Sequence, residues 1–397
     1  MTRILRRRWL TDLLIGLALA LAAAGLLVAP KTTSEAAREG LYICIDVIIP
    51  SLFPFFVLSS LTIELGLAHR IGRVLEPVMR PLFKVSGASA AAVVLGFIGG
   101  YPIGARCAIS LYEKRQCTKA EAERLLAFCN NSGPAFILGA AGVGILGSTR
   151  AGWLLFLTHT AASVTVGVLF RFYKGKGNDS ASARLPPPQR LPSLSDAFTR
   201  SVKSSFASVF YISSFVIFFT AAIRLLYTSG ILPTVANGLS VIFEPLGLSK
   251  ESAQNLLTGL IEITSGLFSL QGGAAVKLAG RMAMAAFMLG WAGLSVHCQV
   301  LSFIGQSGLS PRTYIAGKLL HGALSAVYAF LLTNLVGLEV PVTETIAEQV
   351  ETIARLRFWD TLAAALSVTL VAALAMLLIL GRLLWRRGKR HTGQGRR

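Results

Sequence analysis

Charged residues are scarce in this 397-residue sequence, and acidic ones are the scarcest. Only 14% of the residues are charged, against roughly a quarter in an ordinary soluble domain, and 53% are hydrophobic. This balance excludes a soluble globular protein and a disordered one. No CxxC spacing occurs, so we expect no zinc site and no disulfide framework but five free thiols. They are Cys44, Cys107, Cys117, Cys129 and Cys298.

Motifs for catalysis are missing as well. The sequence contains no HExxH, no GxSxG, no P-loop and no nucleotide-binding module. We therefore expect neither an intramembrane enzyme nor an ATP-driven pump, and we predict no cofactor and no metal site.

The positive charge is unevenly distributed. The net charge of +19 alone could suggest a nucleic-acid binder, but most of the excess falls in residues 1–8, 171–203 and 382–397, each beside a long apolar run. That is the positive-inside pattern of a membrane protein, not a basic groove for nucleic acid. We expect a multi-pass protein of the lipid bilayer with cytoplasmic N- and C-termini.

Apolar runs near the length of about 20 residues that crosses a bilayer core predict eight transmembrane helices. They are residues 10–29, 41–67, 125–147, 151–170, 206–227, 282–304, 314–335 and 358–384. The first is either a cleaved signal peptide or a retained span, and its length favours retention. Two shorter Gly-containing segments, residues 89–104 and 256–270, predict re-entrant pieces that enter and leave on one side.

The order of elements recurs on either side of a Pro-, Ser- and Gly-rich linker. Each half reads as a span, a short amphipathic piece, a re-entrant piece, a broken span and a span, and the two halves have opposite orientation. The predicted units are 1–39 (first helix and external loop), 40–171 (first repeat), 172–203 (cytoplasmic linker), 204–340 (inverted repeat) and 341–397 (external loop, last helix and basic tail). Inverted repeats with broken segments indicate a secondary transporter with a midplane site. The alternative is a helical bundle whose glycines only allow close packing.

Polar residues at the breaks are the candidate site, because a broken helix presents unpaired N–H and C=O groups to a ligand. The predicted substrate-binding residues are Gly100, Tyr101, Gly104, Asn130, Asn131, Ser132, Gly133, Thr264, Ser265, Ser295 and Gln299. The run 130–134 places two amides and a hydroxyl in a span, which is costly and usually functional. A satisfied interhelical hydrogen-bond cluster and, for residues 99–104, a plain turn are the structural alternatives.

Ionisable residues also lie inside the apolar segments. Glu262 is predicted to couple transport to a proton or a sodium ion, and its alternative role is an ion pair with Arg224 or Lys277. His297 is expected to be a packed core residue rather than a proton relay. His159 and His321 are likewise interpreted as packing residues.

At these residues the sequence resembles a known family. The runs 99–105, 121–134 and 262–266 resemble the YlbJ-type sporulation integral membrane proteins, also called stage V sporulation protein V. Their gate, or nucleoside-recognition, repeat is shared more distantly with concentrative nucleoside transporters and the ferrous-iron permease. The resemblance covers about residues 40–335 and implies an all-α fold like that of the nucleoside transporters.

The resemblance also implies a substrate. The family is associated with moving dipicolinic acid across the outer forespore membrane of a sporulating bacterium. We expect half-helix N-termini and the Asn and Ser donors to take the two carboxylates of this planar anion and Tyr101 to take its ring. A nucleoside or another small anion is the alternative substrate, although Gly-Tyr-Pro-Ile-Gly replaces the polar residues of nucleoside carriers in the first re-entrant loop. A non-transporting scaffold for spore-envelope assembly is the alternative of a different class.

Overall fold

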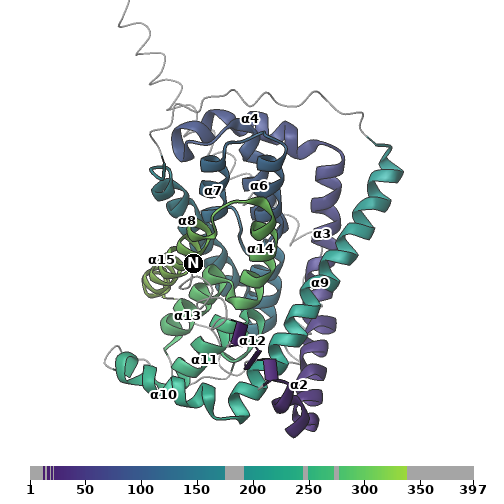
Figure 1. The fold of residues 1–397 in the computed structure, drawn as a ribbon. Helices are drawn as coiled ribbons and strands as arrows, with labels where there is room; N and C mark the ends of the chain where they lie inside the picture. Colours follow the sequence, from purple (N-terminus) through teal and green to yellow (C-terminus); the bar gives the residue numbers. More distant parts are fainter. Residues whose placement is uncertain are drawn as a thin grey trace, which may run out of the picture.

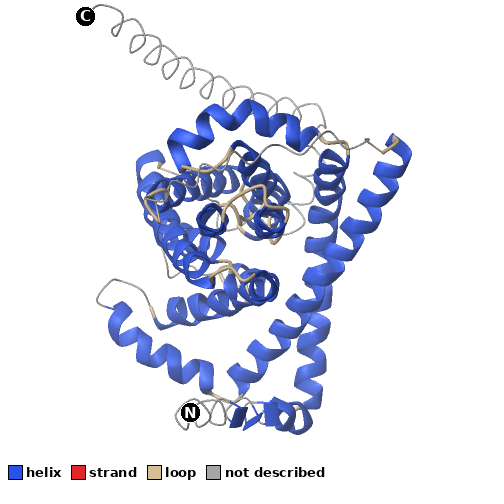
Figure 2. Cartoon of the chain, turned by 45° about the horizontal axis from the view of Figure 1, so that its top comes forward, coloured by secondary structure: helices blue, strands red, loops and turns tan. Residues whose placement is uncertain are grey.

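The computed structural model describes residues 22–174, 192–244, 249–271 and 277–337, and scattered positions between 12 and 20. Every regular element within these ranges is a helix (Figure 2). The first half contains α2 (Pro30–Ile43), η1 (Cys44–Ile48), α3 (Ile49–Glu64), α4 (Leu67–Phe83), η2 (Gly87–Ser89), α5 (Ala90–Gly99), α6 (Ile103–Glu113), α7 (Lys119–Phe128), η3 (Ala135–Ile145) and α8 (Thr149–Phe170). The second contains α9 (Leu194–Thr228), α10 (Ile231–Phe243), α11 (Lys250–Ile261), α12 (Ile263–Phe268), α13 (Leu278–Trp291), α14 (Gly293–Ser307) and α15 (Pro311–Val336).

Four of these segments are long and apolar enough to cross a membrane by length and composition. They are Thr149–Phe170, Leu194–Thr228, Leu278–Ser307 and Pro311–Val336. The end of α4 and the η2–α5 segment meet at 101°, so α4 turns sharply into the first re-entrant piece. The predicted crossings 41–67 and 125–147 correspond to shorter helical segments around α3 and η3. The predicted crossing 358–384 lies outside the described residues, as does most of the linker, and residues 10–29 are described only in part.

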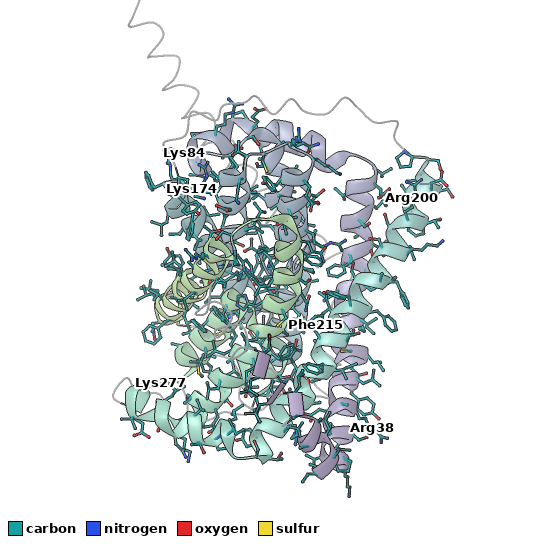
Figure 3. All side chains as sticks on the ribbon, in the orientation of Figure 1. Arg38, Lys84, Lys174, Arg200, Phe215 and Lys277 are labelled. Atoms are coloured by element: carbon teal, nitrogen blue, oxygen red, sulfur yellow. The ribbon has the colours of Figure 1, made fainter. Side chains whose placement is uncertain are left out.

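The two halves run in opposite directions (Figure 1). α3 ascends to α4 at the top of the view, whereas α9 descends to α10 at the bottom. In the same orientation Lys84 and Lys174 lie at the upper end and Lys277 lies at the lower end (Figure 3). Each half then continues through a helical hairpin, a broken helix and a long helix, which is the order that the sequence predicts.

Two groups of helices build the molecule. α9 packs along α2 and α3 and forms a framework at one side (Figure 1), while α15 packs against α7, α8 and α13 within the remaining bundle. Both large apolar clusters draw residues from both halves. One joins α5–α7 to α14 and Tyr314, and the other joins η3 and α8 to α12 and α13. The repeats are therefore interlocked and bury a common core.

The first re-entrant piece is longer than predicted. α5 descends to a tip at residues 100–102 and α6 returns as far as Glu113, so the hairpin does not end at Gly104. Hydropathy misplaced the boundary because Arg106 and Ser110 interrupt the apolar run. Both side chains line a polar cavity, and they belong to the returning arm of the hairpin rather than to a cytoplasmic loop.

Candidate functional site

The tip of the first hairpin packs directly on the break of the α7–η3 helix. A Cβ atom added to Gly100, whose φ is +74°, would lie 2.9 Å from the amide nitrogen of Gly133. Gly96 and Gly104, on the two arms, enclose the carbonyl oxygen of Cys129 so closely that a Cβ on either would overlap it. Glycine is required here because two backbones touch. Gly104 thus shapes the hairpin and does not face a ligand cavity.

The second hairpin meets the break of α13–α14 in the corresponding way. Gly293, with φ +76°, lies against the backbone of residues 261–263 at the hairpin tip. Glu262 is the N-cap of α12, and its carboxylate accepts hydrogen bonds from the backbone N–H groups of Thr264 (3.1 Å) and Ser265 (2.7 Å). The predicted alternative pairing with Arg224 is wrong, because that guanidinium bonds Glu39. One half-helix N-terminus is therefore already occupied by a carboxylate of the protein itself.

A small cavity of about 50 Å³ lies where these four pieces converge on the framework helices. Its framework wall is apolar, and its other wall comes from both hairpin tips and both breaks. The framework residues are Ile48, Leu52, Phe56, Ile212 and Val216; the polar residues are Tyr101, Ser132, Glu262, Thr264, Ser295 and Gln299, beside Gly99, Gly100 and Gly133. Such a volume holds only a few waters and is too small for a larger solute. We call it the closed cavity.

Two cavity-lining side chains have polar atoms with no hydrogen-bond partner in the described part of the chain. They are the hydroxyl of Ser132 and Oε1 of Gln299, and both residues are 2% exposed. Buried polar groups normally have partners, so these atoms are available to a ligand or to water. The predicted residues Asn130, Asn131 and Ser265 do not line this cavity.

Asn130 and Asn131 stabilise the break itself. Asn130 Oδ1 accepts from the amide of Ala105 (3.4 Å), and Asn131 Nδ2 donates to the Phe128 carbonyl (2.9 Å). Ser265 contacts Thr220 on α9, with 3.3 Å between the hydroxyl oxygens. These residues hold the hairpin and the broken helix in place around the cavity.

A lysine that the sequence analysis overlooked lies directly behind this wall. Lys318 on α15 is 1% exposed, and its Nζ donates to Tyr101 Oη (2.9 Å) and to the Asn130 carbonyl (3.0 Å). Tyr101 Oη in turn donates to the Leu289 carbonyl (2.7 Å). The Tyr101 hydroxyl is therefore fully engaged, and only its ring is free to contact a substrate.

His159 and His321 belong to the same cluster rather than to passive packing. Their ring centroids are 4.3 Å apart, and His159 Nε2 accepts from the amide of Ser132 (3.1 Å). His321 Nδ1 lies 3.4 Å from Lys318 Nζ. The interpretation of both as packing residues is corrected by these contacts. His297 packs between Trp291 and Tyr314 as expected, but neither ring nitrogen has a hydrogen-bond partner within the described residues.

Larger cavities open on either side of the closed one. Toward the end that carries α4, a cavity of about 370 Å³ contains Arg106, Lys114 and three serines of α9. Toward the α2 end, a cavity of about 840 Å³ contains Glu35, Glu39 and Asp46 with Arg38 and Arg224. We call them the basic vestibule and the mixed vestibule. The basic vestibule shares Phe56 with the closed cavity, and its charges favour anions.

The chain matches the family described as "Gate: Nucleoside recognition" over residues 45–176 and 209–307, which is more than half of its length. It belongs to the gate, or nucleoside-recognition, family. Among gate proteins it is 31% identical over 324 residues to the sporulation integral membrane protein YlbJ of Bacillus subtilis (strain 168), covering 76% of this chain and 78% of that one. The predicted membership of the YlbJ type is confirmed.

Solved structures of the transporter CNTnw have a similar fold. The inward-facing substrate-bound state gives a TM-score of 0.51 at 14% identity, over 82% of this chain and 87% of that chain. An intermediate state gives 0.53 at 16% identity, over 83% and 87%. This likeness shows the fold alone, and it confirms an all-α polytopic membrane protein of the nucleoside-transporter type. The gate protein described here therefore has a transporter-like fold, and these relatives are membrane proteins rather than enzymes.

Proposed function

We propose that this gate protein is a secondary transporter, or facilitator, that moves a small anionic solute through the closed cavity. The observation that carries the proposal is the convergence of two hairpin tips and two helix breaks on one buried cavity between two vestibules. Broken helices around a midplane site are the arrangement by which secondary transporters hold a solute. Ser132 and Gln299, which line this cavity, carry buried polar atoms without a hydrogen-bond partner in the described ranges, and a ligand can supply such a partner.

The charges around the cavity favour an anion. Lys318 places a buried ammonium behind Tyr101, and Arg106 and Lys114 face the basic vestibule. The charge of Glu262 is directed at the N-terminus of α12, which stabilises it locally. A solute that enters from the basic vestibule thus meets the cations Arg106 and Lys114 first and reaches Glu262 only in the wall of the closed cavity.

Dipicolinic acid is the substrate that we propose, and the outer forespore membrane is its site of action. Support comes from the YlbJ-type relative and from the fit of a planar dicarboxylate to an apolar wall facing polar donors. The ring of Tyr101 and the backbone of Gly100 and Gly133 offer a flat surface. Because the cavity holds only a few waters, loading requires the hairpin tips to move apart.

Uptake into proteoliposomes tests the proposal. Purified protein should accumulate labelled dipicolinate, and Ser132→Ala should lower the rate by about tenfold, or about 1.4 kcal/mol, without lowering the melting temperature, because the lost hydroxyl has no partner. Ser214→Ala is the matched control, since that exposed hydroxyl bonds only its own helix. Folded protein that takes up no small anion would refute transport of this class.

A nucleoside is the second candidate substrate, favoured by the fold of CNTnw. Labelled uridine should not enter the same vesicles, and unlabelled uridine should not compete with dipicolinate. Uridine uptake that Ser132→Ala abolishes would instead assign the cavity to a nucleoside.

A further inference from the structure

The ammonium of Lys318 is buried where a broken helix ends. It bonds the Asn130 carbonyl just beyond the last residue of α7, and no carboxylate lies within 4.0 Å of it in the described ranges. An unpaired charge in the membrane interior is costly and marks a functional group.

The hydrogen-bond partners around Lys318 indicate its protonation state. The carbonyl of Leu289 can only accept, so the Tyr101 hydroxyl donates to it and receives a proton from Lys318. The Asn130 carbonyl is a second obligatory acceptor. Two of the N–H groups on Nζ are thereby assigned.

The third contact requires a third N–H group. His321 Nε2 lies 2.9 Å from the carbonyl of His159, so Nε2 carries the ring proton and Nδ1 is left as an acceptor toward Lys318. Three acceptors surround Nζ, and a neutral amine has only two protons. The set therefore fits an ammonium ion.

The neighbouring histidines do not add charge. His159 Nε2 accepts from the Ser132 amide, which places its proton on Nδ1 and leaves the ring neutral. Lys318 is consequently the cation of this cluster. Glu262 is the charged group that the opposite hairpin contributes to the cavity wall.

The Lys318 ammonium lies at the C-terminal end of α7. Carbonyls at half-helix C-terminal ends are the groups with which transporters coordinate coupling cations, and the helix dipole is negative there. At the end of α7 two of these carbonyls already have donors. Phe128 O accepts from Asn131 Nδ2 and Ser163 Oγ, and Asn130 O accepts from Lys318.

We propose that the Lys318 ammonium is a resident cation that takes the place of an exchangeable coupling ion at the break of α7. The inference deepens the proposed anion transport and rests on it. With a positive charge held directly behind the Tyr101 wall, an anion entering the cavity is compensated by the protein once Glu262 is protonated, and it requires no accompanying sodium ion. Of the two coupling ions that the sequence allows, only the proton at Glu262 then remains.

Melting of the purified protein tests the resident cation without any transport. Replacing Na⁺ by choline should leave the melting temperature of the wild type unchanged, because the Lys318 ammonium already fills the cation position at the break of α7. A melting temperature that rises with Na⁺ concentration would overturn the proposal. Lys318→Met should melt lower than the wild type, whereas Lys203→Met, an exposed lysine of α9, should not; equal melting of all three would also overturn it.

Dipicolinate uptake provides the second measurement. Wild-type uptake should be the same in Na⁺ and in choline, and Lys318→Met should reduce it by about tenfold or more, or about 1.4 kcal/mol per decade. Lys318→Arg should retain part of the rate because it keeps the charge. Wild-type uptake that requires Na⁺, or a Lys318→Met rate equal to wild type, would overturn the resident cation. If the wild type transports no dipicolinate, the proposed function fails and the melting comparison alone decides this inference.

Discussion

The two helix breaks have the same backbone plan and opposite chemistry. In the first half a hairpin tip with positive φ at Gly100 rests on Gly133, and the adjoining helix end holds the Lys318 ammonium. In the second half Gly293 rests on the hairpin tip, and the adjoining helix start holds the Glu262 carboxylate. The cation lies at a helix C-terminus and the anion at a helix N-terminus, where the helix dipole stabilises each.

The two repeats therefore have similar backbones but differ in the charge that lies beside each helix end. Both charges come from the second half: Lys318 of α15 reaches across to the break of the first half, whereas Glu262 caps α12 of its own half. The vestibules extend the asymmetry, since one is basic and the other carries both signs. Variants of the glycine contacts, of Glu262 and of the vestibules test this difference.

Glycine contacts should give the largest effect. Gly96→Ala would drive a Cβ to 1.7 Å from the carbonyl oxygen of Cys129, so we expect a loss of about 4 kcal/mol or more, in the tail of point-mutation effects. Gly293→Ala should cost less, about 1–3 kcal/mol, because its Cβ would lie 3.0 Å from Ile263 N in a strained conformation. Melting in detergent measures both. Gly305→Ala, with nothing within 4 Å, should melt at or above wild type, and a Gly96 variant as stable as this control would contradict the close packing.

Neutralising Glu262 should have an intermediate effect. In Glu262→Gln one oxygen still accepts an N–H, but the amide group faces the other N–H of the α12 cap, costing about 1–3 kcal/mol. We expect gradient-driven accumulation of dipicolinate to disappear while exchange down a gradient persists. Glu251→Gln, an exposed acid in the first turn of α11, is the control. Accumulation that survives unchanged in Glu262→Gln would show that Glu262 does not couple transport.

The vestibules should give the smallest effect. Arg106→Gln or Lys114→Gln should raise KM for dipicolinate by about two- to fivefold from the basic side alone, and more at low salt, because exposed cations act by screened attraction. Arg38→Gln in the mixed vestibule should leave that KM unchanged. The KM for dipicolinate is measured in vesicles that contain the protein in either orientation. An equal rise of KM from both sides would contradict the proposed difference between the two vestibules.

The sequence predicted the breaks because glycine, proline and amides interrupt otherwise apolar runs at 130–134, 262–266 and 290–293. Helix-breaking residues act locally, so their positions are readable without tertiary contacts. The returning arm α6 was missed for the same local reason. Its polar residues face a cavity, and hydropathy alone cannot distinguish such a helix from a loop.

Lys318 is absent from the predicted site because one lysine within an apolar run does not by itself show what its side chain contacts. A local signal existed, since Lys318 and His321 are three residues apart within an apolar span and must share one face of α15. Their partners were not predictable. Tyr101, Asn130 and His159 come from three other elements, and only the interlocking of the two halves brings them to Lys318.

Accessibility of the closed cavity tests the central claim most directly. In a background with Cys298→Ser and Cys107→Ser, which removes the two cysteines that are not fully buried, a Ser132→Cys variant is labelled with a membrane-impermeant thiol reagent applied to one side of the membrane at a time. If two inverted halves enclose a shared transport site, the thiol should react from each side and dipicolinate should slow both reactions. A thiol that reacts from neither side, or at a rate that dipicolinate does not change, would contradict the account.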